Sequence, residues 1–408
     1  MFRDKEIYPF LSIVVPFGMG FYLSYLYRSI NLVIEPQLRA EFGLSASALG
    51  FITGLYFVSF ALAQLPLGVA VDRYGPRKVQ IVLTAIAVGG GLLFASSTSV
   101  LWLAVSRLII GLGVAGGITP LITANALWFS QKEQPLVNSI GLCFGGLGAL
   151  SATTPVQILL EHYSWREIFF LISGLAIFLL VVLCAFVPER QKEPVKAKTT
   201  WIVQILWVYK KKQFWQIAAL PITGFAAYTA YQCLWAGPFL RDVNYFGSKE
   251  IAEILMWLQV GMLLGTLASG VLANYFALSG PALKIFVFWS ISFFILLQFV
   301  IATFPKFYPY FSWFLYGYFG SFLFLCYSIF TQAFGALSAG RVVACCNILM
   351  FLGVFGLQWA IGWFIDPMIN IYFGSDKSSL HQLGLLCTII PQFFALILFL
   401  RFKMPRNV

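Results

Sequence analysis

Two arginines lie within long apolar stretches of this sequence. Arg28 stands in the string Tyr27–Leu32, and Arg107 opens a glycine-containing stretch that ends at Gly116. An arginine inside a membrane segment costs roughly 2.5–3.5 kcal/mol on insertion scales, so each needs a polar cavity or a partner. Because a guanidinium is permanently charged and presents a planar set of donors, both residues are candidates for binding a carboxylate or another oxyanion.

The composition predicts that these arginines are held by membrane-spanning helices. Of the 408 residues, 60% are hydrophobic and 10% are charged, and the mean hydropathy is +0.86. A soluble chain has about 45–50% apolar and about 25% charged residues. Helices satisfy their own backbone groups in lipid, and the apolar stretches have helical length. We predict twelve spans, at 9–33, 47–71, 77–97, 99–127, 135–159, 166–187, 213–239, 250–276, 283–303, 308–334, 341–365 and 381–402.

The basic residues predict the orientation of the chain. The net charge is +11, but 18 of the 26 Lys and Arg fall in alternate connections and 6 fall in the others. The positive-inside rule then places both termini in the cytoplasm and favours a membrane protein over a nucleic-acid-binding one. Arg107 is about eight residues from the outer end of its span, roughly 12 Å deep, which is far for snorkelling; Arg28 is roughly 8 Å deep and has the alternatives of snorkelling or pairing with Glu35.

One polar connection divides the chain into two halves. We predict a six-helix bundle over 1–187, a cytoplasmic linker over 188–212 and a second six-helix bundle over 213–408. The halves are similar to one another, since Gly68–Asp72 aligns with Gly270–Asn274. Similar six-helix halves are typical of secondary transporters, in which the solute binds near the midplane.

A short charged loop joins the second and third predicted spans. It contains Gly68, Asp72, Arg73, Gly75, Arg77 and Lys78 in the pattern G-x-x-x-D-R-x-G-x-R-K. Gly68 suits close helix packing and Gly75 suits a tight turn. The pattern resembles the loop between helices 2 and 3 of the major facilitator superfamily of secondary transporters. The resemblance implies a cytoplasmic latch, in which Asp72 contacts the positive N-terminal end of the eleventh span.

Two further strings resemble the same family. The pattern R-x-x-x-G-x-G from Arg107 to Gly113 resembles the motif of its fourth span, and Arg28-x-x-Asn31-Leu32 resembles the first span of its organic-anion branch, with Tyr27 where that branch has an acid. In this fold, spans 1, 4, 7 and 10 line the central cavity. The predicted solute-binding residues are the polar residues of spans 1 and 4 and one aromatic face of span 7: Arg28, Asn31, Arg107, Tyr228, Tyr231 and Trp235.

The charge balance of such a cavity predicts the kind of solute. Two guanidiniums in one low-dielectric cavity repel one another unless an anion lies between them. No acid stands near the middle of a predicted span, so we expect the solute to be anionic or zwitterionic. Glu35, Glu253 and Asp366, near outer span ends, are the candidates for proton coupling, with His162 as a further possibility, and uncoupled diffusion or exchange remains an alternative.

The overall prediction is an importer that works by alternating access. A drug or metabolite efflux antiporter is the main alternative, and a non-transporting solute sensor is a further one. The sequence contains none of the common hydrolase, metalloprotease or phosphate-binding motifs, so we do not expect an enzyme. The seven cysteines lie in predicted spans, which indicates neither disulfides nor a metal site. We expect no cofactor, membrane lipids and protons as partners beside the solute, and a monomer in a bacterial inner membrane.

Overall fold

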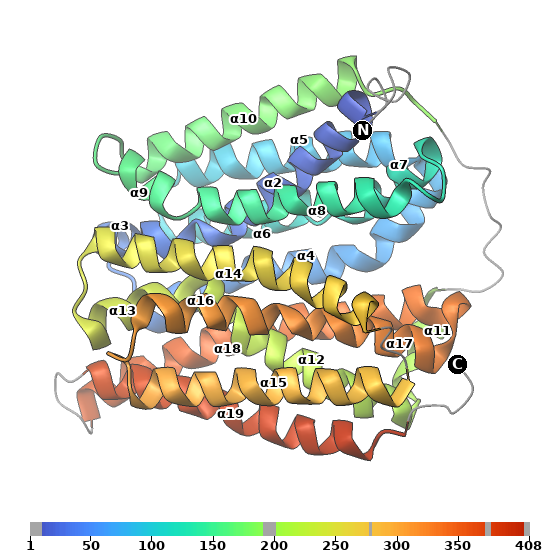
Figure 1. The fold of residues 1–408 in the computed structure, drawn as a ribbon. Helices are drawn as coiled ribbons and strands as arrows, with labels where there is room; N and C mark the ends of the chain where they lie inside the picture. The colour runs from blue at the N-terminus through green and yellow to red at the C-terminus, as the bar shows by residue number, and fades with distance from the viewer. Residues whose placement is uncertain (1–9, 191–200, 277–279, 372–376, 404–408) are drawn as a thin grey trace. The chain divides into compact units, whose positions relative to one another are not determined.

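The computed structural model describes residues 10–190, 201–276, 280–371 and 377–403, and all regular elements in these ranges are helices (Figure 1). The described residues form two compact units by their contacts. The first contains residues up to 43 and from 55 to 190, and the second contains 44–54 and the residues from 201 onward. One long helix, α4, therefore contributes its first turns to the second unit and the remainder to the first. The predicted division into 1–187, 188–212 and 213–408 stays a prediction.

The first unit is built from short and long helices in sequence order. They are η1 (Phe10–Val14), α2 (Val15–Ser29), α3 (Asn31–Phe42), most of α4 (Ala46–Tyr74), α5 (Pro76–Ala95), α6 (Val100–Gly113), α7 (Thr119–Trp128), α8 (Gln134–Ser151), α9 (Thr154–Leu159) and α10 (Trp165–Ala185). Within this unit α5 packs against α6 and α10, and α2 packs against α8.

The second unit contains the remaining helices. They are α11 (Trp201–Tyr209), α12 (Lys212–Ala230), η2 (Tyr231–Trp235), α13 (Ala236–Asn244), α14 (Ser248–Tyr275), α15 (Gly280–Thr303), α16 (Pro309–Gly320), η3 (Ser321–Leu325), α17 (Cys326–Phe334), α18 (Ala336–Ile371) and α19 (Lys377–Arg401). Here α14 packs against α16, while α12 packs against α18 and α19.

The prediction of an all-helical, polytopic membrane protein is confirmed. Ten helices of the described residues are long and apolar enough to cross a membrane. The two other predicted spans are interrupted helices. The span at 99–127 breaks between α6 and α7, and the span at 213–239 contains the π-helix η2 between α12 and α13. The first predicted span also bends at Ile30, where α2 ends and α3 begins.

Local sequence explains where several helices begin. Gly75 has a φ of 83°, a left-handed value that glycine adopts without strain, and it makes the turn between α4 and α5. Ser164 caps α10 in a capping box with Glu167. At the start of α10, Arg166 and Trp165 donate hydrogen bonds of 2.7 and 2.8 Å to Glu41 of α3, and the bond from Arg166 is the main reason that the pKa of Glu41 is lowered.

The second unit has a tightly packed helix seam between the start of α4 and the middle of α18. A methyl group added at Gly362 would lie 2.3 Å from the carbonyl oxygen of Ala46, and one added at Gly50 would lie 2.3 Å from the carbonyl oxygen of Gln358. Small residues let helix backbones approach this closely in a membrane. The seam explains why the first turns of α4 group with the second unit.

Candidate functional site

Arg107 is fully enclosed in the first unit. Its side chain is 0% exposed on α6. The Nη1 group donates a hydrogen bond of 3.2 Å to the carbonyl oxygen of Tyr27, and Nη2 donates to the side-chain oxygen of Asn31. The guanidinium lies over the ring of Phe94 at 4.2 Å and near that of Phe169 at 5.6 Å. These partners are neutral, so the positive charge is stabilised by dipoles and ring faces.

The contacts of Arg107 fix the bend in the first span. Tyr27 lies in the last turn of α2 and Asn31 begins α3, so one guanidinium joins the two helices across Ile30. Arg28 follows Tyr27 directly and therefore stands in the segment that Arg107 holds. Two of the predicted solute-binding residues, Arg107 and Asn31, are bonded to one another in this structure.

Arg28 lies in an aromatic pocket between α2 and α4. Its residue is 5% exposed. The guanidinium carbon is 4.4 Å from the ring centroid of Tyr25, 5.5 Å from that of Phe60 and 5.9 Å from that of Phe57. Ring faces attract a cation, so these three rings help to hold the guanidinium in place.

The aromatic residues predicted on span 7 are buried in the packing of the second unit. Tyr228, Tyr231 and Trp235 are each exposed by 1% or less. Trp235 donates a hydrogen bond of 3.1 Å to the carbonyl oxygen of Gln358, and the ring of Tyr231 lies 6.4 Å from that of Trp313. The π-helix η2 runs from Tyr231 to Trp235 and interrupts the regular α-helical spacing on which the predicted aromatic face is based.

The three candidate proton-coupling acids have different surroundings. Glu35 is buried on α3 and forms an ion pair of 3.4 Å with Arg39. Glu253 is exposed and accepts a hydrogen bond of 3.1 Å from the hydroxyl of Tyr310. Asp366, on α18, accepts hydrogen bonds from the backbone N–H groups of Ala46 and Ser47 at the start of α4.

Sequence reasoning missed an ionisable pair in the second unit. His381 Nε2 of α19 lies 3.1 Å from Asp242 Oδ2 of α13, and Asp242 Oδ1 lies 3.1 Å from Arg241 Nε. Burial would raise the pKa of Asp242, but the hydrogen bond from His381 and the charge of Arg241 outweigh it and lower the pKa to about 2. The signal was present in the sequence, since an acid lies just after span 7 and one of only two histidines begins span 12.

The loop after α4 is held mainly by its basic residues. Arg77 donates hydrogen bonds of 3.2 and 2.6 Å to the carbonyl oxygens of Leu183 and Cys184 at the end of α10. Arg77 and Lys78 both form ion pairs with Glu189. These contacts attach the loop to the end of the sixth predicted span.

The remaining residues of the loop motif are at its exposed side. Asp72 and Arg73 are exposed, and Arg73 lies 5.2 Å from the ring centroid of Tyr74. A methyl group at Gly68 would meet no atom of the described residues within 4 Å, so the close approach predicted for Gly68 is absent here. The predicted latch role of Asp72 stays a prediction.

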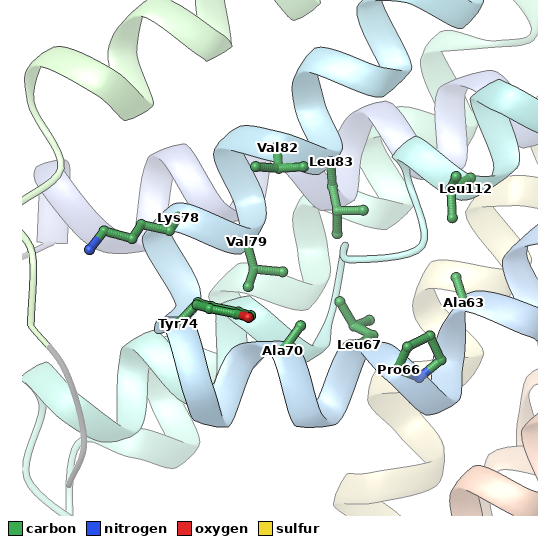
Figure 2. Close-up of a pocket in the computed structure, with 10 residues that line it drawn as sticks. All are labelled: Ala63, Pro66, Leu67, Ala70, Tyr74, Lys78, Val79, Val82, Leu83 and Leu112. Carbon is green, nitrogen blue, oxygen red and sulfur yellow. The ribbon is translucent and has the colours of Figure 1, made fainter. Parts of the chain in front are cut away.

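A groove of about 440 Å³ lies between α4 and α5 beside this loop (Figure 2). Its walls are apolar side chains, including Leu67, Val79 and Leu83, and Lys78 lies at one end. The ammonium of Lys78 pairs with Glu189. Such a surface offers an anionic solute few polar contacts, so it is not the candidate solute site.

Comparison with known families accounts for the helical architecture and the motifs together. Residues 17–365 match the Major Facilitator Superfamily. The chain belongs to this superfamily. It is therefore a transporter, not an enzyme, and a multi-pass membrane protein.

Named relatives of this superfamily member align with part of their length. The chain is 29% identical over 157 residues to the probable sulfoacetate transporter SauU of Cupriavidus necator, which is 38% of this chain and 36% of that protein. It is 22% identical over 252 residues to the putative tartrate transporter of Agrobacterium vitis, which is 58% of this chain and 53% of that protein. The alignments thus span about a third to half of these relatives.

A solved structure confirms the superfamily fold over nearly the whole chain. The crystal structure of a D-xylose-proton symporter matches with a TM-score of 0.74 and covers 96% of this chain and 98% of that one. The sequence identity is 15%, so this similarity concerns the fold alone.

Proposed function

We propose that this protein imports a small anionic or zwitterionic solute by alternating access, and that Arg28 binds the negatively charged group of the solute. The observation that carries the proposal is the pair of buried guanidiniums at one bend of the first span. Arg107 is held by neutral groups and holds the bend, and Arg28 sits beside it in an aromatic pocket. The anion supplies the negative charge that this cationic segment attracts.

The names of the relatives support the same chemical class. Sulfoacetate and tartrate, the solutes named for two of them, are organic anions. A guanidinium can bind a carboxylate or sulfonate through two parallel hydrogen bonds, which a neutral sugar cannot reproduce. The bacterial relatives and the positive-inside distribution support a bacterial inner membrane as the location.

In this proposal the two arginines have different tasks. Arg28 contacts the solute, while Arg107 and Asn31 position the segment that carries Arg28. Asp72 acts as the cytoplasmic latch, supported by Arg73, Arg77 and Lys78. We therefore expect Asp72→Asn to slow transport cycles while leaving solute binding close to wild type.

Counterflow in proteoliposomes tests the proposal. Vesicles containing the purified protein are loaded with unlabelled sulfoacetate, tartrate, niacin, alanine or xylose, and uptake of the same labelled compound is measured. We expect exchange of at least one anion or zwitterion and none of xylose. Arg28→Ala should abolish that exchange, and Arg28→Lys should retain a small part of it because a lysine keeps the charge and loses the bidentate geometry.

The matched control is Arg190→Ala. Arg190 is an exposed arginine whose guanidinium lies 5.3 Å from the ring of Trp128, outside the proposed site. It should exchange solute at the wild-type rate. Wild-type exchange in Arg28→Ala would refute the site, and exchange of xylose or of a cationic dye in preference to every anion would refute the solute class.

A further inference from the structure

The pair His381 and Asp242 joins two helices that are far apart in the chain. Asp242 lies in the last turn of α13, and His381 lies in the second turn of α19, 139 residues later. An ionised carboxylate only accepts hydrogen bonds, so the 3.1 Å contact requires Nε2 of the imidazole to carry a proton. The other ring nitrogen, Nδ1, is buried and has no hydrogen-bond partner among the described residues.

The surroundings of Nδ1 make its protonation state depend on the packing. The imidazole lies 6.2 Å from the ring of Trp235 and 6.5 Å from that of Phe239, and His381 is 3% exposed. A second proton would bind at Nδ1 and make both nitrogens donors. In the present packing that new N–H would be a buried donor with no acceptor among the described residues, which is unfavourable. An added proton is therefore stabilised by a different packing of α13 and α19.

Solvent reaches the pair through its acid. The side chain of Asp242 is 16% exposed and that of Arg241 is 32% exposed. The predicted topology places the end of α13 and the start of α19 at the outer surface. The outer solution therefore reaches Asp242 directly, and a proton passes from hydronium to Nδ1, leaving water, only when the packing around the imidazole opens.

Among the ionisable groups on the neighbouring helices, Asp242 is the one that contacts His381 directly. The helices packed against α19 are α12, α13, α15 and α18, and α13 also packs against η2 and α14. Their described charged and titratable residues, together with those of α19, are Lys212, Tyr228, Tyr231, Cys233, Arg241, Asp242, Lys249, Glu250, Glu253, Tyr275, Lys284, Arg341, Cys345, Cys346, Asp366, Lys377, Cys387 and Arg401.

Several of these groups are engaged elsewhere. Lys284 donates to the carbonyl oxygens of Leu400 and Phe402, at the other end of α19. Glu253 accepts from Tyr310, and Asp366 accepts from the backbone at the start of α4. The hydrogen bond of His381 to Asp242 is the ionisable contact that the structure gives to this imidazole.

We propose that His381 and Asp242 form the proton-binding site of this transporter, and that the inward proton gradient drives solute uptake through them. The inference rests on the proposed function. A proton that binds one packing of α13 and α19 better than another shifts the equilibrium between conformations by that difference in affinity. Glu35, Glu253 and Asp366 then have structural roles, since each is bonded to a group in its own surroundings.

The test separates driven uptake from exchange. Proteoliposomes that show counterflow of sulfoacetate or tartrate are given an inward proton gradient, and accumulation of the same labelled anion is measured. Wild type should concentrate the anion severalfold. His381→Gln and Asp242→Asn should reach only the equilibrium level while keeping counterflow within about threefold of wild type, because exchange needs no net proton transfer.

The chain offers a matched control, since its other histidine, His162, is exposed. His162→Gln should accumulate the anion like wild type. Gradient-driven accumulation in His381→Gln equal to wild type would overturn the proposal. Counterflow by the wild-type protein with no response to the proton gradient would also overturn this proposal, but it would leave the proposed function standing. Absence of counterflow in wild type would instead overturn the proposed function.

A second measurement does not depend on transport. In the His162→Gln protein, His381 is the only histidine, so its ¹³C-labelled ring can be followed by NMR in nanodiscs. We expect the ring signal to change reversibly as the pH is lowered, and Asp242→Asn to alter that change. A ring signal that does not respond to pH while the protein stays folded would overturn the proposal even if the transport variants fail to fold.

Discussion

The carboxylate of Asp366 makes a contact whose removal has a defined local consequence. The backbone N–H groups of Ala46 and Ser47 donate hydrogen bonds of 2.8 and 2.7 Å to its two oxygens. Both donors belong to the first turn of α4, where backbone N–H groups have no acceptor within the helix. The acid therefore caps a helix 320 residues away in the chain.

The substitution Asp366→Asn tests this cap. Asparagine retains one acceptor oxygen and replaces the other with an NH₂ group, which cannot accept from a backbone N–H. A hydrogen bond to a charged group contributes about 1.5–3 kcal/mol net, and the helix dipole adds about 0.3–1 kcal/mol. Because Asp366 is only half-buried, we take the lower part of this range, about 2 kcal/mol. That free energy corresponds to roughly a thirtyfold change in an equilibrium constant.

Hydrogen–deuterium exchange measures the effect where it occurs. In Asp366→Asn the amides of residues 46 and 47 should exchange about thirtyfold faster than in wild type, since their opening becomes that much more frequent. Glu250→Gln is a suitable control, because Glu250 accepts from Gly247 N at the start of α14 and should change exchange there only. Unchanged exchange at the start of α4 in Asp366→Asn would refute the capping argument.

Three other substitutions give distinct outcomes. A methyl at Gly362 would lie 2.3 Å from a backbone oxygen of α4, so Gly362→Ala should lower the thermal midpoint by several degrees. As the control, Gly356→Ala on the same helix places its methyl where no atom lies within 4 Å, and it should raise the thermal midpoint slightly. Equal thermal midpoints in the two variants would contradict the close packing of α4 against α18. The pKa of Glu41 is lowered by Arg166, so its ionised carboxylate stabilises the fold at a pH above the pKa of the unfolded state, and this stabilisation is lost as the pH falls through the pKa of the folded state. Glu41→Gln should therefore lower the thermal midpoint at pH 7 and match wild type in strong acid. A difference in thermal midpoint that grows on acidification would contradict this. Arg107→Gln should weaken anion binding at least tenfold in a thermal-shift titration, because the bend that carries Arg28 loses the charged donor of Arg107. Unchanged anion binding would show that the bend is held in place without Arg107.

Much of the fold could be predicted because its signals are local. The spans follow from the length of apolar stretches, and their orientation follows from counts of Lys and Arg in the connections. The breaks were not predicted, since the interruption after α6 and the π-helix η2 both fall within apolar sequence. The bend at Ile30 was missed for the same reason, since Ile30 lies inside the apolar stretch of the first span. The sequence also did not show that α3 continues to Phe42, beyond that stretch.

The candidate site shows where local reasoning stops. Arg107 stands out in the sequence as a charged residue in an apolar segment, but its partners, Tyr27 and Asn31, lie 80 and 76 residues away. A sequence pattern gives no information about which distant groups a buried arginine is bonded to. The same applies to His381, whose partner Asp242 lies 139 residues away.

The sequence by itself determined that this chain crosses the membrane many times, belongs to a transporter family and carries buried positive charge, because hydrophobicity, charge and short motifs are properties of neighbouring residues. Only the tertiary structure decided that Arg107 holds a helix bend, that Asp366 caps α4 and that His381 faces Asp242. The physical reason is that hydrogen bonds act over about 3 Å between side chains whose proximity depends on how the helices pack, and that packing is not encoded within any one segment.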